Sequence, residues 1–310
     1  MRKTFINTLI EEARKDERIF LITPDLGYSI LEPFQAEFPE RFLNVGIAEQ
    51  NAIGVAAGLA LNGKIPYVYS IIPFVTSRCF EQVKIDCAYM KTNVRIVGVG
   101  AGYSYGSAGA THHSIEDIAI MRALPNLAIV APGCPNEVKE LTKHSVNHQG
   151  AIYIRLSKSG EPVVNNVKIE FAKLSTLIDG HDFAIIATSN MLEEAHNIAL
   201  DYVKEGRSPI LLSAHTLKPF DREKIKEFIS LKIPIITMEE HSIVGGLASI
   251  VSEIIALSGT GVKFMPIAIP DEFSHFVGGQ KFIKEKMGLG NNKLKIDKFL
   301  SENIVCPKTF

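Results

Sequence analysis

Glu49 is the first residue of this sequence that points to chemistry. It begins the helical segment 49–60, in which nearly every residue is small or apolar. The segment is therefore expected to form a helix buried nearly all round, and burying a carboxylate is costly unless it is paired or hydrogen-bonded. Glu49 either serves the backbone N–H groups and dipole of its own helix start or binds another partner. Gly54 and Gly58 share one face of this helix, where a second helix could approach closely.

A glycine-rich loop, residues 100–113, ends in two adjacent histidines. His112 and His113 follow the apolar segment 94–99, which predicts a strand, and they precede a predicted helix. In open α/β sheets, ligands gather beyond the carboxyl ends of the strands. Histidines at that place could hydrogen-bond sugar hydroxyls or transfer protons near neutral pH. The alternative is that they cap the helix or hold the loop.

Aromatic and basic side chains form a third candidate set, which spans the end of one predicted strand and the start of the next predicted helix. Its members are Tyr69, Phe74, Arg78 and Phe80. Stacking on a flat ligand is one use of such a set, and packing in the core is the more ordinary use of aromatic residues.

Two further polar features follow predicted strands. Lys158 could bind phosphate or remain a solvated surface lysine. Residues 239–241 read Glu-Glu-His before two glycines. They could form a second site, although helix capping and loop packing explain them more simply.

Strands and helices alternate along the chain and must position these residues. This alternation predicts an α/β protein with parallel, doubly wound sheets and helices on both faces. Segment 94–99 is almost continuously apolar, which is typical of a strand covered on both sides. The rhythm breaks after residue 157 and resumes at residue 181, so we expect two domains, 1–170 and 171–310.

Composition narrows the function classes. A chain of 310 residues suits two domains, and its net charge of -1 gives no electrostatic reason to expect nucleic acid or an anionic membrane as partner. No apolar run reaches the length of a membrane span, and residues 1–16 lack the apolar core of a signal peptide. The four cysteines form no Cys-x-x-Cys pair. We therefore expect a cytoplasmic protein with reduced thiols.

The order and spacing of these motifs resemble a known family. Segments 41–50, 78–83, 109–113 and 124–132 resemble the pyrimidine-binding domain of transketolases and deoxyxylulose-5-phosphate synthases. Segment 238–246 resembles the transketolase C-terminal domain. The resemblance covers nearly the whole chain and implies two doubly wound α/β domains, a pyrimidine-binding domain followed by a transketolase C-terminal-like domain.

The resemblance implies thiamine diphosphate as cofactor and two-carbon (ketol) transfer from a ketose to an aldose. In this family a glutamate at the position of Glu49 hydrogen-bonds a ring nitrogen of the aminopyrimidine and promotes the tautomer that deprotonates the thiazolium carbon. Phe74 is the best match for the residue that stacks on the aminopyrimidine, followed by Tyr69. Arg78 and Phe80 are expected beside the cofactor.

The same resemblance implies substrate contacts. His112 matches the family's substrate-contacting histidine, with catalytic and binding roles, and His113 lies next to it. Lys158 falls where the family often has a phosphate-binding arginine. Ala108 departs from the pattern because the family usually has an aspartate there, so the acceptor sugar stays open.

The family anchors the cofactor's diphosphate and Mg²⁺ through Gly-Asp-Gly, which does not occur in this sequence. We therefore expect a split transketolase in which a separate N-terminal subunit holds the diphosphate and Mg²⁺, in an α2β2 assembly, with no metal ligands on this chain. Three alternatives stay open: a β-subunit-like component of a 2-oxoacid dehydrogenase, a split deoxyxylulose-5-phosphate synthase, and a non-catalytic partner of a thiamine enzyme.

Overall fold

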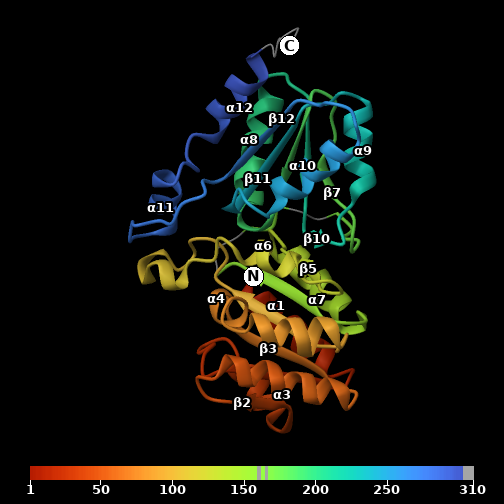
Figure 1. The fold of residues 1–310 in the computed structure, drawn as a ribbon, viewed down its shortest axis with the longest axis vertical. Helices are drawn as coiled ribbons and strands as arrows, with labels where there is room; N and C mark the ends of the chain where they lie inside the picture. Colours follow the sequence, from red (N-terminus) through yellow and green to blue (C-terminus); the bar gives the residue numbers. More distant parts are fainter. Residues whose placement is uncertain (159–161, 165–166, 303–310) are drawn as a thin grey trace.

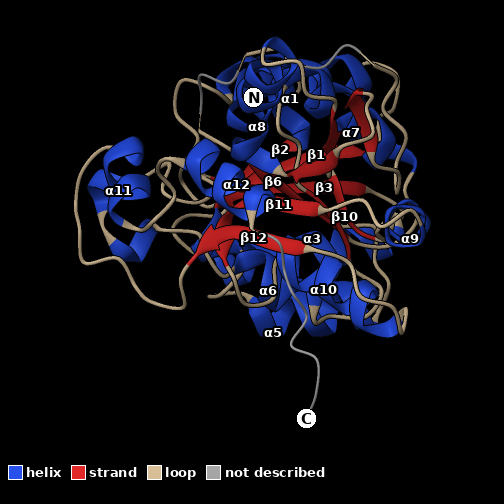
Figure 2. Ribbon diagram, turned by 90° about the horizontal axis from the view of Figure 1, so that it is seen from above, coloured by secondary structure: helices blue, strands red, loops and turns tan. Residues whose placement is uncertain are grey.

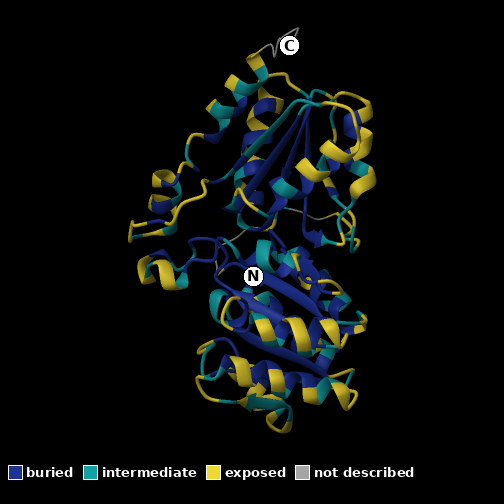
Figure 3. Cartoon of the chain, in the orientation of Figure 1, coloured by how far each residue is buried: buried dark blue, intermediate teal, exposed yellow. Residues whose placement is uncertain are grey.

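The computed structural model describes residues 1–158, 162–164 and 167–302. Two mostly parallel β-sheets follow one another along the long axis of the molecule (Figure 1). Helices lie on both sides of the strands, and α11 (Gln280–Lys286) stands out to one side (Figure 2). The strands of both sheets are largely buried (Figure 3). The predicted pair of doubly wound α/β units is confirmed.

The first sheet has seven strands in the order β10-β5-β6-β4-β3-β1-β2. All neighbours are parallel except β10, which comes from the second half of the chain and pairs antiparallel with β5. The strands are β1 (Ile19–Thr23), β2 (Phe42–Asn44), β3 (Ile65–Ile71), β4 (Arg95–Val99), β5 (Ala128–Val130), β6 (Ile152–Leu156) and β10 (Thr216–Lys218).

Alternating side chains of these strands enter two apolar cores, one on each face. Tyr67 and Tyr69 of β3 face the core that contains α1 and α7, whereas Val68 faces the core that contains α3, η2 and α6. Period-two alternation in a doubly covered strand produces this division. The helices are α1 (Arg2–Ala13), α3 (Glu49–Leu61), η2 (Val83–Tyr89), α6 (Asp117–Arg122) and α7 (Pro135–Asn147). Shorter turns are α2 (Glu32–Glu37), η1 (Pro39–Arg41), α4 (Ile72–Val75), α5 (Phe80–Gln82), η3 (Gly106–Ala108) and η4 (Ala110–His112).

The second sheet has five strands in the order β12-β11-β8-β9-β7, with β7 antiparallel to β9. Its strands are β7 (Ser175–Ile178), β8 (Phe183–Ala187), β9 (Pro209–Ser213), β11 (Ile235–Ser242) and β12 (Phe264–Ile269). The apolar faces of α8, α11 and α12 belong to one core, and those of α9 and α10 belong to another. These elements are η5 (Ser189–Met191), α8 (Leu192–Lys204), α9 (Arg222–Ser230), α10 (Leu247–Leu257) and α12 (Asn292–Ser301).

One predicted helix has a different form. The segment 78–90 was expected to be a single helix, but it consists of the short turn α5 followed by the π-helix η2. A π-helix has more residues per turn than an α-helix. The wider turn keeps Val83, Cys87 and Ala88 together on the buried side.

A buried ion pair joins the two halves of the chain. Arg155, at the end of β6, lies 2.9 Å from the Asp117 carboxylate at the start of α6, and both side chains are at most 2% exposed. The Arg155 guanidinium also donates to the carbonyl oxygen of Glu240 in β11 and to the hydroxyl of Ser189. The Tyr153 hydroxyl donates to the same aspartate at 2.7 Å. Arg155 thus has acceptors from both sheets.

None of the helices in the described ranges is long and apolar enough to cross a bilayer. Cys79, Cys87 and Cys134 are buried free thiols, and burial raises the pKa of Cys87 to about 12. Cys306 lies outside the described residues.

We predict that Asp117→Asn lowers the free energy of unfolding by about 3–5 kcal/mol, because it leaves the Arg155 charge buried without a counter-charge. Urea unfolding followed by circular dichroism measures this loss. The exposed pair Lys224–Glu227 provides the control, since Glu227→Gln should change stability by less than about 1 kcal/mol. Equal effects of the two substitutions would contradict the prediction.

Candidate active site

Glu49 lies at the start of α3 and is 3% exposed. Gly46 precedes it with φ +74°, a backbone conformation that favours glycine and lets the chain turn from β2 into the helix. The Glu49 carboxylate accepts a hydrogen bond of 2.7 Å from Nη1 of Arg78. The described hydrogen bond of this carboxylate therefore goes to a side chain from the next segment of the chain, rather than to its own helix start.

Helix α3 is not buried all round in this chain, contrary to the expectation from its composition. Its inner face enters the core through Ala52, Ile53 and Ala56, while Gly54 and Gly58 are exposed, with open space where a Cβ would stand. Small residues therefore form the outer face, and nothing in the described chain covers it.

Phe74, Arg78 and His112 meet in front of Glu49. The Arg78 guanidinium carbon lies 4.4 Å from the centroid of the Phe74 ring, within the range of a cation–π contact. The His112 ring meets the Phe74 ring edge-on, with centroids 5.1 Å apart and planes at 72°. The structure thus brings together four of the residues singled out from the sequence, on α3, α4, η4 and the turn after α4.

Loop residues connect His112 to Lys158. The Tyr105 ring lies 6.3 Å from the His112 ring, and the Lys158 ammonium lies 4.9 Å from the centroid of Tyr105. The Arg2 side chain donates to the carbonyl oxygen of Lys158 at 2.5 Å. Sequence reasoning missed Tyr105 and Arg2. Tyr105 carried a local signal, since it lies in the glycine-rich loop, whereas Arg2 comes from a helix about a hundred residues away in sequence and carried none.

His113 has a different environment from His112. It is buried, its ring meets Tyr103 edge-on at 4.9 Å, and its Nε2 lies 3.5 Å from the carbonyl oxygen of Gly106. Burial lowers the pKa of His113, so its neutral form is favoured. These contacts lie within the loop, and they support a role for His113 in holding the loop beside His112.

Tyr69 and Phe80 lie away from this group. The Tyr69 ring is fully buried on the α1 side of the sheet and stacks on Phe5, with centroids 6.1 Å apart, whereas α3 packs on the other side. Phe80 is half-buried against the core beneath α3. Strand alternation decides the position of Tyr69, because its odd-numbered neighbours in β3 face the α1 side. Cofactor binding by these two residues stays a prediction, and their described contacts are those of packing.

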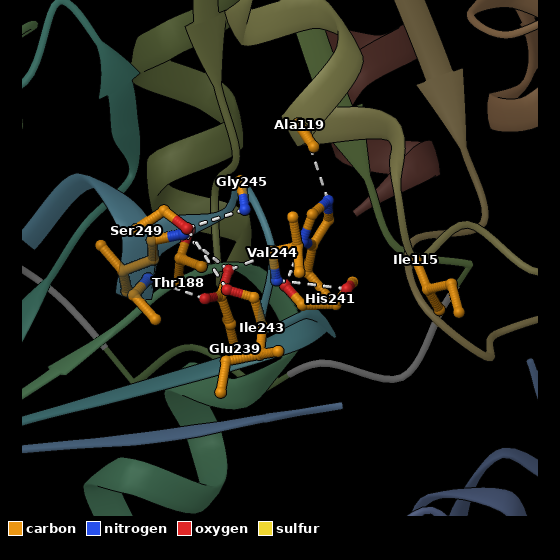
Figure 4. A network of polar contacts seen from close by, with 12 residues as sticks. Ile115, Ala119, Thr188, Glu239, His241, Ile243, Val244, Gly245 and Ser249 are labelled. Atoms are coloured by element: carbon orange, nitrogen blue, oxygen red, sulfur yellow. Dashed lines mark hydrogen bonds and ion pairs between the residues drawn. The ribbon is translucent and has the colours of Figure 1, made fainter. Parts of the chain in front are cut away.

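A second polar cluster lies where β11 meets the first domain (Figure 4). Glu239 accepts hydrogen bonds of 2.7 and 2.8 Å from the backbone N–H groups of Leu247 and Ala248, so it caps α10 as the simpler sequence interpretation proposed. Burial raises the pKa of Glu239 to about 7. His241 accepts at Nε2 from the backbone N–H of Ala119 at 3.4 Å, and its Nδ1 lies 2.8 Å from the carbonyl oxygen of Ser242.

Known proteins resemble this chain over nearly its whole length. The model of the transketolase pyrimidine-binding domain matches residues 1–162, and that of the transketolase C-terminal domain matches residues 172–284. One of the two subunits of an apulose-4-phosphate transketolase of Phocaeicola vulgatus is 41% identical over 275 residues, which cover 87% of this chain and 88% of that protein.

A putative transketolase C-terminal section of Methanocaldococcus jannaschii is 38% identical over 92% of this chain and 90% of its own length. Among solved structures, a split-gene transketolase described as an inactive β4 tetramer superposes with a TM-score of 0.88. It shares 34% identity with this chain, over 96% of this chain and 97% of that one.

We predict that His241 makes the fold sensitive to acid. Burial lowers its pKa from an ordinary value near 6.5 to about 4, so the native state favours the neutral ring. The stabilisation is complete above about pH 6.5 and is lost as the pH falls towards 4, by an amount on the order of 3 kcal/mol. His241→Asn should be less stable at neutral pH and should show a smaller loss across this window.

The measurement is the free energy of unfolding in urea at intervals from pH 7.5 to pH 4. His181→Asn serves as the control, because the His181 side chain is 82% exposed. Parallel pH profiles for the wild-type protein and His241→Asn would refute the prediction.

Proposed function

The chain belongs to the transketolase family, and on that premise we propose that it is the pyrimidine-binding subunit of a split transketolase. It takes part in thiamine diphosphate-dependent transfer of a two-carbon ketol unit from a ketose to an aldose. The observation that carries this proposal is the buried Glu49 carboxylate beside the Phe74 ring. The match to a relative whose name makes it one subunit of a transketolase supports the split arrangement.

The residues around Glu49 fit the aminopyrimidine end of the cofactor. Arg78 itself provides the test, because its guanidinium is flat, donates an N–H to Glu49 and lies over Phe74. An aminopyrimidine ring is also flat and has N–H groups to donate. The same carboxylate and ring can therefore hold it, provided that Arg78, whose side chain is 45% exposed, moves aside or shifts along the Phe74 face.

Thiamine diphosphate, when bound, supplies the thiazolium carbon that attacks the ketose and the electron sink for bond cleavage. Glu49 holds the proton of the pyrimidine ring, and its hydrogen bond is strengthened by exclusion of water. Phe74 fixes the plane of the ring. His112, edge-on to Phe74, contacts the substrate and transfers a proton to or from its oxygen.

We propose that a separate subunit carrying Gly-Asp-Gly holds the diphosphate and Mg²⁺. Within the residues that the structure describes, no group of three or more His, Cys, Asp or Glu residues could hold a metal ion. The assembly is an α2β2 heterotetramer, and the chain divides near residue 170 into its two domains. The protein is cytoplasmic.

A second copy of this chain covers the outer face of α3 in this assembly. Gly54 and Gly58 leave that face open, and Leu61, Tyr89 and Met90 are exposed around it. Small residues let two helices approach closely, and the exposed apolar side chains supply area to bury. The β4 tetramer of the split-gene relative supports self-association through this type of chain.

The substrate is a sugar or, by preference, a sugar phosphate. Lys158 and Arg2 lie on the far side of Tyr105 from His112, where they supply positive charge for a phosphate group. The name of the Phocaeicola vulgatus relative includes a phosphorylated sugar, which supports this preference.

Purification from the native cells tests the split arrangement. We expect a stoichiometric companion with Gly-Asp-Gly, identified by mass spectrometry, and ketol transfer by the pair when ketose and aldose phosphates are supplied. Release of carbon dioxide from pyruvate would instead indicate a split deoxyxylulose-5-phosphate synthase, or, if coupled to oxidation, a 2-oxoacid dehydrogenase component. Isolation of the chain alone, with no binding of thiamine diphosphate in any mixture, would favour the non-catalytic alternative.

We predict that Glu49→Gln lowers kcat of the assembled enzyme by about 10²–10⁴-fold, because the amide cannot take the proton of the pyrimidine ring. The fold should persist, since glutamine has nearly the same shape. Circular dichroism and the turnover of a ketose phosphate measure the two properties. Glu81→Gln, at an exposed position nearby, should retain full activity. Near-normal turnover of Glu49→Gln would refute the assignment.

We also predict that Gly54→Leu blocks assembly, because its side chain projects from the open face of α3. The circular dichroism spectrum and Tm of the single chain should change little, while light scattering after gel filtration should give a smaller particle. Gly261→Leu, at another open glycine in the second domain, is the matched control and should leave assembly unchanged. An unaltered mass for Gly54→Leu would place the interface elsewhere.

A further inference from the structure

Glu240 is a buried carboxylate that the proposed chemistry does not use. It lies at the end of β11 and is 1% exposed. Three hydrogen-bond donors converge on it from three different segments. They are the backbone N–H of Tyr103 at 2.6 Å, the side-chain amide of Asn190 at 2.6 Å and the side-chain amide of Gln280 at 2.9 and 3.1 Å. A carboxylate with charge-assisted bonds of this kind is a strong anchor.

The Tyr103 donor belongs to the loop that carries both histidines. Gly102 and Ser114 form an isolated antiparallel bridge, with N–H to carbonyl distances of 3.0 and 2.9 Å, and this bridge closes the neck of the loop. Glu240 therefore binds the first residue inside the neck. The Tyr103 ring in turn packs against His113, which precedes the bridge on the other side.

The second domain also holds the other side of this neck. The backbone N–H of Ser242 donates to the carbonyl oxygen of Ile115 at 2.7 Å, and Arg155 donates to the carbonyl oxygens of Ser114 and Glu240. The end of β11 therefore contacts the loop where it leaves the first domain and where it returns.

The approach of Glu240 to the neck depends on a glycine. Gly102 has φ +60°, and a Cβ at this position would lie 2.4 Å from Oε1 of Glu240 and 2.5 Å from its Cδ. A side chain there would push the carboxylate away from the Tyr103 N–H. Sequence and structure agree on this point, since glycine occupies the one residue that must leave room for the carboxylate.

We propose that Glu240 is a positioning residue through which the second domain fixes the loop 102–114 and thereby orients His112 and His113 towards the substrate. Its importance for catalysis rests on the proposed function, whereas its effect on the loop does not. The inference assigns to the second domain a direct part in the construction of the active site, although it contributes no side chain to the group around Glu49.

Glu240→Gln tests the proposal because it removes acceptor capacity with little change of shape. An amide nitrogen would face at least one of the three donors, so the anchor weakens. We expect amide hydrogen exchange in residues 102–114 of the full-length chain to become about tenfold faster or more, as expected for a local opening that has become easier.

The matched control is Glu239→Gln. Glu239 is the adjacent residue of β11, equally buried, but its side chain caps α10 instead of binding the loop. This variant should lower Tm without faster exchange in residues 102–114. Unchanged exchange in Glu240→Gln, or equal acceleration in the two variants, would overturn the proposal.

Gln280→Ala is the second variant, used if Glu240→Gln does not fold. It removes one donor to Glu240 from a partly exposed position and should accelerate exchange in the loop by about threefold. No change in the exchange of the loop would likewise overturn the proposal.

Kinetics of the assembled enzyme test the consequence for the substrate. We expect Glu240→Gln to raise KM for the ketose phosphate about tenfold while kcat falls less than about threefold, because the histidines are displaced but not removed. Loss of kcat with unchanged KM would overturn the orientation of His112 by Glu240. If the wild-type assembly transfers no ketol unit, the proposed function fails, while the exchange experiment still decides whether Glu240 anchors the loop.

Discussion

The buried cation of Arg155 is the constraint on which the arrangement of the two halves depends. A guanidinium in the interior must have its charge neutralised and its N–H groups accepted, because the cost of removing it from water is several kcal/mol. Asp117 supplies the charge from the start of α6, and Ser114, Ser189 and Glu240 supply further acceptors. These partners come from both sheets and from the histidine loop. Satisfying one side chain therefore fixes the relative positions of three separate parts of the chain.

Carboxylates in this protein differ in function because their partners differ. Glu239 meets two backbone N–H groups and caps a helix, and Glu240 meets three donors and holds a loop. Glu49 meets only one described donor, the side chain of Arg78, which is itself half-exposed and can move. A buried carboxylate with a movable partner can exchange that partner for a ligand. The physical difference between an anchoring and a reacting carboxylate thus lies in how firmly its donors are held.

Division of labour between the domains follows from the same contacts. The first domain supplies the side chains that meet in front of Glu49, from α3, α4 and the loop after β4. The second domain adds β10 to the edge of the first sheet and holds the neck of the loop through β11. An apolar core that includes Met121 and Leu124 continues into Leu217 and Leu247, so the two sheets are joined by packing as well as by hydrogen bonds. The loop is consequently as well positioned as the interface between the domains is rigid.

Local patterns in the sequence determined much of this protein. The alternation of apolar segments predicted both sheets, and the small residues after Glu49 predicted α3, because backbone period and side-chain burial are set locally. The sequence also singled out Glu49, Phe74, Arg78 and His112, which meet in the structure. It could not show that Tyr69 faces α1, that segment 78–90 contains a π-helix, or that β10 returns to the first sheet, since each depends on which face or edge is left to cover. The roles of Arg2 and Glu240 were decided by tertiary structure alone. Their partners are distant in sequence, and a hydrogen bond requires closeness in space, which the fold alone provides.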